Sequence, residues 1–138
     1  MKISFVAGLT LLSITCFVVS LTQVGYMIDG APYSGRGIEL FLKGWLGPLK
    51  GIFAWYANPL LFAAWVAIQQ RQKTLAISFS LLSLLLICSF FLHTRTTTLF
   101  DAEVFITGYA LGFWLWLWSG IIALIAGFCI TGRRLENL

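Results

Sequence analysis

Charged residues are scarce in this sequence. Only 10% of its 138 residues are Asp, Glu, Lys or Arg, whereas 59% are hydrophobic, and the mean hydropathy is +0.92. A water-soluble domain of this length would have too little polar surface to cover so many apolar side chains, so a lipid bilayer has to take them up. The nine basic residues form no stripe suited to phosphates, and we expect no nucleic-acid partner.

Histidine and cysteine are also rare. His93 is the only histidine, and Cys16, Cys88 and Cys129 lie in three different apolar runs with no CxxC pair. This scarcity argues against bis-histidine haem ligation, a metal centre, a disulfide framework and a thiol relay. Neither a Ser/His/Asp arrangement nor a glycine-rich phosphate loop is recognisable. We therefore expect a protein that is not an enzyme and that needs no cofactor or metal.

Long apolar runs dominate what is present. They cover residues 3–21, 51–68, 75–92 and 104–130, and each can cross a hydrocarbon layer of about 30 Å as a helix. They predict one all-α domain, a bundle of four transmembrane helices, in which the polar turn at residues 69–74 joins the second and third into a hairpin. The first run has no A-x-A site after it, so we expect it to be retained rather than cleaved.

The segment between the first two runs, residues 22–50, is predicted to be an outer loop that ends in a short helix. Gly25, Gly30 and Pro32 indicate turns with little periodicity. From Ile38 onward, apolar residues recur at spacings of three and four, which predicts an amphipathic helix over residues 38–47 lying in the membrane interface. The alternative is that this segment extends the second transmembrane helix outwards.

Two local signals concern the helix starts. The pair Asn58-Pro59 predicts a kink or local unwinding near residues 54–58, because proline removes a backbone donor and clashes with the preceding turn. Thr98 and Asp101 match a capping box, and Glu103 would add negative charge to the first turn of the fourth helix.

One side of the fourth run carries small residues, while Trp114 and Trp118 lie opposite. On a helix, the small residues fall within an arc of about 100°; they are Gly108, Gly112, Ser119, Ala123, Ala126 and Gly127. Small side chains let membrane helices approach closely, so this face is predicted to contact protein. The alternative is that glycine and alanine are simply common in membrane helices. The first run has a similar side, formed by Ser4, Gly8, Thr15 and Thr22. We expect this side to pack against another span.

Basic residues indicate an orientation. Four spans place both termini on one side, and that side carries the densest positive charge, from Lys2, Arg71, Lys73, Arg133 and Arg134. Positive charge in short loops marks the cytoplasmic side. We therefore expect a multi-pass protein of the cell inner membrane with both termini in the cytoplasm.

A group of polar and aromatic residues is predicted at the outer surface. Its members are Lys50, Trp55, Asn58, Asp101, Glu103, Tyr109 and Trp116. Charges near hydrocarbon are usually paired or functional, and we hypothesise that Lys50 pairs with Asp101 or Glu103 on the floor of an aromatic pocket open to the outer leaflet. The alternative is that these groups extend to water and anchor helix ends.

The sequence favours a non-enzymatic membrane protein that works by lateral association. It would be an accessory or assembly subunit of a larger membrane complex, or a homo-oligomer, with the bilayer and another membrane protein or itself as partners. The alternative is a small oligomeric transporter, or a protein that binds a lipid or small molecule in the outer pocket.

Overall fold

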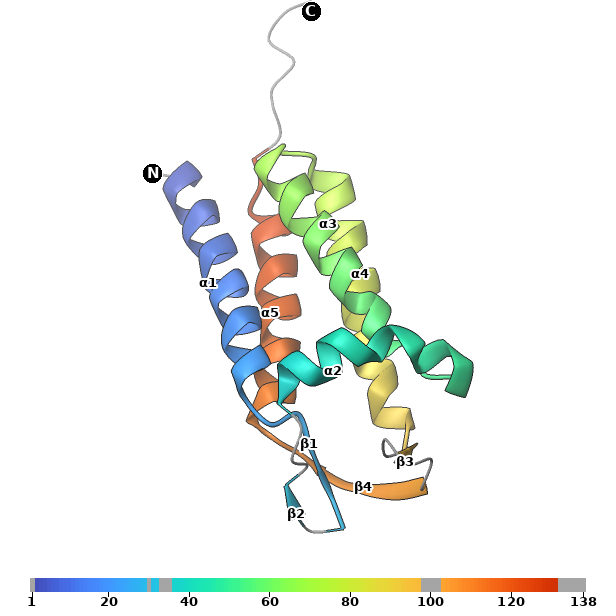
Figure 1. Cartoon of the computed structure of the whole chain (residues 1–138). Helices are drawn as coiled ribbons and strands as arrows, with labels where there is room; N and C mark the ends of the chain where they lie inside the picture. Colours follow the sequence, from blue (N-terminus) through green and yellow to red (C-terminus); the bar gives the residue numbers. More distant parts are fainter. Residues whose placement is uncertain (1, 30, 33–35, 98–102, 132–138) are drawn as a thin grey trace, which may run out of the picture.

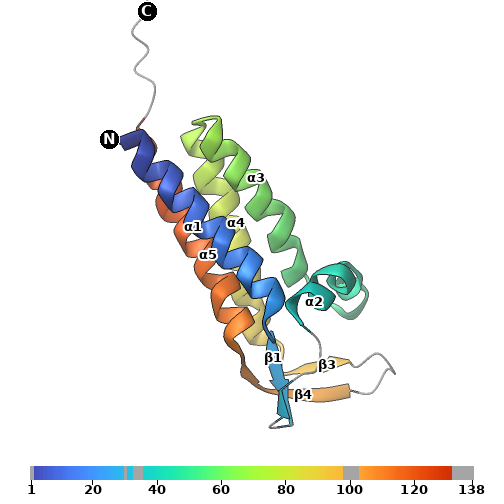
Figure 2. The ribbon, with the colours of Figure 1, turned by 60° about the vertical axis from the view of Figure 1, so that its left-hand side comes forward.

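Helices form most of the chain. The computed structural model describes residues 2–29, 31–32, 36–97 and 103–131, in which α1 (Lys2–Thr22), α3 (Ala57–Gln69), α4 (Lys73–Ser89) and α5 (Leu111–Phe128) lie side by side (Figures 1 and 2). The start of α1, the turn between α3 and α4 and the end of α5 lie at the same end of this bundle (Figure 1).

Three of the helices are long and apolar enough to cross a membrane, over Phe5–Thr22, Lys73–Leu92 and Leu111–Phe128. The third of these windows lies within the predicted fourth span. The predicted second span is shorter than expected, because α3 has 13 residues and reaches only about 20 Å, against about 30 Å of hydrocarbon. A 3-10 turn, η2 (Ala54–Tyr56), precedes α3.

The predicted unwinding near residues 54–58 is confirmed as a change of helix type. The chain runs as the 3-10 turn η2 up to Tyr56 and becomes an α-helix at Ala57. Pro59 is the third residue of α3, where a backbone N–H has no partner inside the helix, so the proline is tolerated. The helix therefore begins at residue 57 rather than 51.

Small residues at the helix contacts hold the bundle together. α1 packs mainly on α5, α3 on α4, and α4 also on α5. Because small side chains bring the helix axes close together, van der Waals contact can replace the hydrophobic effect that is missing in lipid. The fully buried members of these contacts include Ala57, Ala64, Ala76, Ala123, Ala126, Ser80, Ser83 and Ser119.

Hydrogen bonds link the helices through their interior. The Ser13 hydroxyl of α1 donates to the carbonyl oxygen of Ser119 in α5 at 2.7 Å. The indole Nε1 of Trp65, in α3, donates to the oxygen of the same Ser13 hydroxyl at 2.9 Å. Ser83 in α4 donates to the carbonyl oxygen of Ala57 in α3 at 2.9 Å. Polar groups away from water need such partners, so these bonds fix the rotation of each helix.

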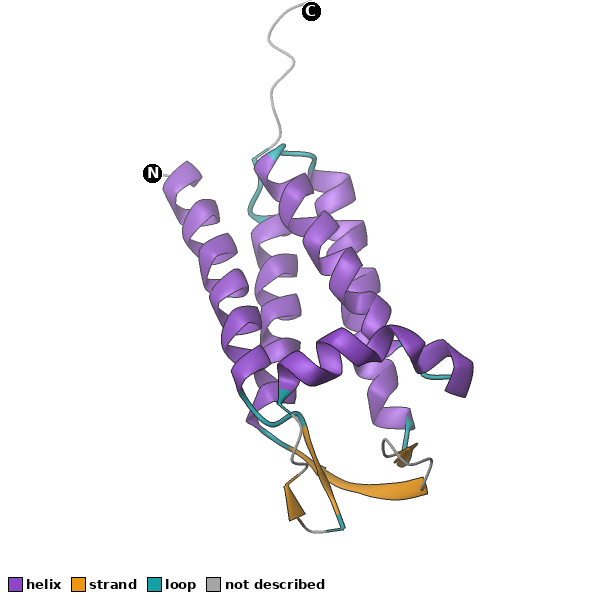
Figure 3. Cartoon of the chain, viewed as in Figure 1, coloured by secondary structure: helices purple, strands orange, loops and turns teal. Residues whose placement is uncertain are grey.

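A four-stranded antiparallel sheet corrects the all-α prediction. Its strands are β1 (Tyr26–Ile28), β2 (Ala31–Pro32), β3 (Arg95–Thr97) and β4 (Glu103–Tyr109), in the order β2-β1-β4-β3. The sheet lies at the end of the bundle opposite to the start of α1 (Figures 1 and 3). The predicted irregular loop after α1 is therefore partly strand.

The predicted helix over residues 104–130 is wrong in its first part. Residues 104–109 belong to β4, and α5 begins only at Leu111. Val104, Phe105 and Ile106 favour extended backbone, and β1 and β3 supply hydrogen-bonding partners on both sides. Two further predictions change with it: Gly108 lies in β4 opposite Met27 rather than on the helix, and Glu103 begins a strand rather than a helical turn. The predicted capping box, Thr98 with Asp101, lies outside the described residues.

The segment after the sheet's first hairpin forms a helix of its own. α2 (Gly37–Lys43) continues as a 3-10 helix, η1 (Gly44–Lys50), and the two lie across the end of the bundle (Figure 1). Gly51 ends this segment with φ of 75°, a left-handed conformation that glycine adopts easily. The segment is thus separate from α3, and the alternative of an outward extension of that helix is wrong.

Candidate functional site

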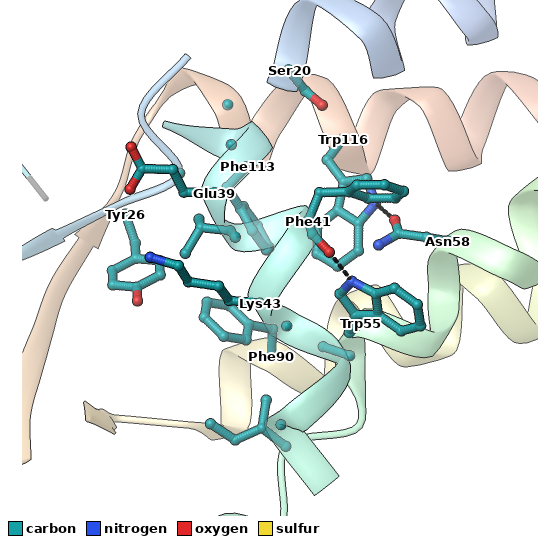
Figure 4. A pocket seen from close by; sticks show the side chains of 18 of the residues that line it. Ser20, Tyr26, Glu39, Phe41, Lys43, Trp55, Asn58, Phe90, Phe113 and Trp116 are labelled. Carbon is teal, nitrogen blue, oxygen red and sulfur yellow. Dashed lines mark hydrogen bonds between the residues drawn. The ribbon is translucent and has the colours of Figure 1, made fainter. Parts of the chain in front are cut away.

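A cavity of about 490 Å³ lies between α2–η1 and the end of the helical bundle (Figure 4). This volume is within the range of about 300–1,000 Å³ typical of small-molecule sites. Aromatic side chains from both sides of the cavity dominate its lining: Phe17, Tyr26, Phe41, Trp55, Phe90, Phe113 and Trp116.

The aromatic walls come from elements that are distant in the sequence. Phe17 near the end of α1 contacts Phe41 of α2 edge to face, with ring centroids 6.0 Å apart. The indole Nε1 of Trp55 donates to the Phe41 carbonyl oxygen at 2.6 Å, so η2 is tied to α2. Such contacts fix ring orientations beyond what area burial alone would do.

Asn58 and Trp116 form the polar contact inside the cavity wall. Asn58 is 5% exposed, and its Oδ1 accepts a hydrogen bond from the Trp116 Nε1 at 2.9 Å (Figure 4). The amide therefore satisfies the buried indole donor and joins the start of α3 to α5.

Charged side chains lie on one side of the same cavity. Glu39 and Lys43 are one turn apart on α2, and Figure 4 shows both near Tyr26, away from Trp55 and Asn58. Lys50 at the end of η1 also lines the cavity. The charged side chains of the site therefore all come from α2–η1, which also contributes Leu40 and Phe41 to the apolar lining.

The structure brings together four of the seven predicted pocket residues: Lys50, Trp55, Asn58 and Trp116 all line the cavity. Tyr109 lies beside it, with its ring against Phe113 at 4.6 Å between centroids and its hydroxyl donating to the Phe90 carbonyl oxygen at 3.4 Å. Burial raises the pKa of the Tyr109 phenol above its ordinary value.

The hypothesised ion pair of Lys50 with Asp101 or Glu103 stays a prediction. Asp101 lies outside the described residues, and of Glu103 only the backbone position in β4 is described.

The small-residue face of α5 is turned inward. Gly112, Ser119, Ala123 and Gly127 are all buried, whereas Trp114 and Trp118 on the opposite face are 43% and 54% exposed. A Cβ atom on Gly112 would lie only 2.7 Å from the Val24 carbonyl oxygen, and one on Gly127 would lie 3.4 Å from Ile77. This face thus contacts the chain's own helices and the segment after α1.

The corresponding side of α1 is different. A Cβ atom on Gly8 would meet nothing within 4 Å, and Thr15 and Thr22 are exposed. The expectation that this side packs against another span of the chain is therefore wrong. α1 turns Ser13 and Phe17 toward the bundle instead, because Ser13 finds an acceptor there and Phe17 enters the aromatic cluster.

Sequence reasoning missed several residues that line the cavity. Phe41 was on the apolar face of the predicted amphipathic helix, and Glu39 and Lys43 form an i,i+4 pair on it, so their common location was recognisable. Phe17 and Phe113 carry no signal that distinguishes them from other aromatic residues in apolar runs.

Among the described residues, no three His, Cys, Asp or Glu side chains gather where they could hold a metal ion. Comparisons with protein-family models, with curated proteins and with solved structures found no match to this chain. The argument for function therefore depends on the geometry of the site.

Proposed function

We propose that this chain is a non-enzymatic integral membrane protein that binds an apolar ligand from the bilayer in the cavity beneath α2. The observation that carries the proposal is the cavity itself: about 490 Å³ of space, lined mainly by aromatic and aliphatic side chains, at the end of helices long enough to span a membrane.

The proposed membrane placement follows from the outward-facing side chains. Leu11 on α1, Leu85 on α4 and Trp118 on α5 are each more than half exposed, as expected of side chains that face lipid tails. We propose that α3 with η2 is the fourth, shorter span and that α2 lies in the interface.

The proposed orientation places Arg71 and Lys73, in the turn between α3 and α4, in the cytoplasm together with both termini. In a cell inner membrane, the sheet and the cavity would then face the outer leaflet.

Filling the cavity tests the proposal. Leu40 lines it, whereas Leu42, on the same helix, is 63% exposed and does not. Wild-type protein purified in mild detergent and examined by native mass spectrometry should carry a bound lipid or other apolar molecule. Leu40→Trp should lose that molecule, while Leu42→Trp should retain it. Equal retention by both variants, or no bound molecule in the wild type, would contradict ligand binding in this cavity.

A binding role fits better than transport. Leu61, Ile87 and Ala123 are fully buried in the middle of the bundle, so close packing fills the interior between the cavity and the opposite end of the helices. A transport pathway through one copy would have to open this core.

Lateral association is the second candidate, and the surface that favours it lies on α1. The uncovered side formed by Gly8, Thr15 and Thr22 would let a second copy or another membrane protein approach closely. Chemical crosslinking in native membranes tests this: Gly8→Leu should reduce the crosslinked species, and Ser78→Leu, at an exposed position on α4, should not. Identical crosslinking of wild type and Gly8→Leu would remove the basis for association through α1.

A further inference from the structure

The indole N–H groups of the two tryptophans that line the cavity are both used in hydrogen bonds within the protein. The Nε1 of Trp55 is bonded to the Phe41 carbonyl oxygen, and that of Trp116 to Asn58 Oδ1 (Figure 4). Ser20, which also lines the cavity, donates its hydroxyl to the carbonyl oxygen of Phe17 at 2.6 Å. These three donors are already used within the protein, so apart from the Asn58 amide nitrogen, this part of the cavity favours a chain of methylene groups over a polar molecule.

The charged side chains of the lining all come from α2–η1, where they lie beside apolar residues such as Leu40 and Phe41. They are two cations, Lys43 and Lys50, and one anion, Glu39. Within the part of the chain that the structure describes, Lys43 forms no ion pair, although Glu39 is only one turn away on the same helix. A lysine beside apolar surface keeps its ammonium group at the edge, where an anionic group of a ligand can meet it.

We infer that the ligand of the proposed site is a phospholipid. One acyl chain would lie between the aromatic side chains of the bundle, and the phosphate would lie beside Lys43. This inference rests on the proposed function and specifies its ligand. The polar-to-apolar direction of the cavity matches that of a lipid molecule, and α2–η1, proposed to lie at the interface, is where the phosphate layer meets the acyl chains.

The test compares two lipids that differ only in the phosphate-containing head group. Full-length protein in mild detergent is incubated with equal amounts of phosphatidylglycerol and of diacylglycerol with the same acyl chains, and bound lipid is counted by native mass spectrometry. Wild-type protein should retain phosphatidylglycerol preferentially. Lys43→Gln should lower that retention about fivefold, equivalent to about 1 kcal/mol, and should leave diacylglycerol unchanged.

Lys73→Gln is the matched control, because Lys73 is an exposed lysine at the far end of the bundle and does not line the cavity. It should alter neither lipid. Equal binding of the two lipids to wild type, or an undiminished preference in Lys43→Gln, would overturn the phosphate contact while leaving apolar binding in place. If the wild type bound neither lipid, the proposed function and this inference would both be overturned. The same would follow if Leu40→Trp retained as much of both lipids as the wild type does.

Discussion

Replacing Gly112 by alanine is expected to destabilise the folded chain. The added Cβ atom would lie 2.7 Å from the Val24 carbonyl oxygen and 3.1 Å from that of Gln23. The Val24 oxygen is held in place because it accepts a hydrogen bond from the Gly112 amide at 2.9 Å. Backbone has to shift, and forcing an extra group into a packed site costs about 1–3 kcal/mol.

Gly8 provides the matched control. An alanine Cβ there meets nothing within 4 Å, and in a helix interior alanine is preferred over glycine by about 0.8–1.0 kcal/mol. Gly8→Ala should therefore be neutral or stabilising. The two variants should differ by about 2–4 kcal/mol, which is about a thirtyfold or larger difference in the folding equilibrium.

Reversible unfolding in mixed micelles of mild detergent and SDS, followed by tryptophan fluorescence, measures this difference. Because Gly112 contacts its own chain, the loss should appear as lower stability of the single chain at every protein concentration. If Gly112→Ala proved as stable as Gly8→Ala, the close approach of α5 to the segment after α1 would be refuted.

Three further experiments test the interior and the sheet. In a double-mutant cycle of Ser13→Ala and Trp65→Phe, the two changes should be coupled by about 0.6–1.7 kcal/mol, and strict additivity of their unfolding free energies would contradict the hydrogen bond between them. Asn58→Leu removes the acceptor of the Trp116 indole and should lower the unfolding free energy by about 1–3 kcal/mol, measured in the same micelles; an unchanged value would refute that role. Ile106→Pro removes an amide that donates to a carbonyl just before β3 and should speed amide hydrogen exchange in β1 and β4 without changing the helical circular dichroism signal. Unaltered exchange in both strands would contradict the sheet.

The helices were predictable because their signal is long and local. α1 and α4 need only a sustained apolar run, and the small residues of α5 mark its inward face through their spacing alone. Asn58-Pro59 indicated the irregular start of α3 because the effect of proline on the backbone is local too.

The sheet and most of the cavity depend on partners that are distant in the sequence. Val104 to Tyr109 is as apolar as a membrane helix, and only pairing with β1 and β3 makes it a strand. Likewise, Phe17 and Phe113 line the cavity because α2 folds back across the end of the bundle, an arrangement that no local pattern specifies.

The main neighbour of α1 is α5, which is translated last among the described helices. Ser13 finds its acceptor 106 positions further along the chain, and β1, which follows α1, pairs with β4, which precedes α5. During biosynthesis, α2 and α3 can cover only part of the inward side of α1, through Phe17 and Ser13, and its main neighbour is added only when α5 has been translated. Chains truncated before residue 111 should accordingly be substrates for membrane quality-control proteases, whatever the state of the α3–α4 hairpin.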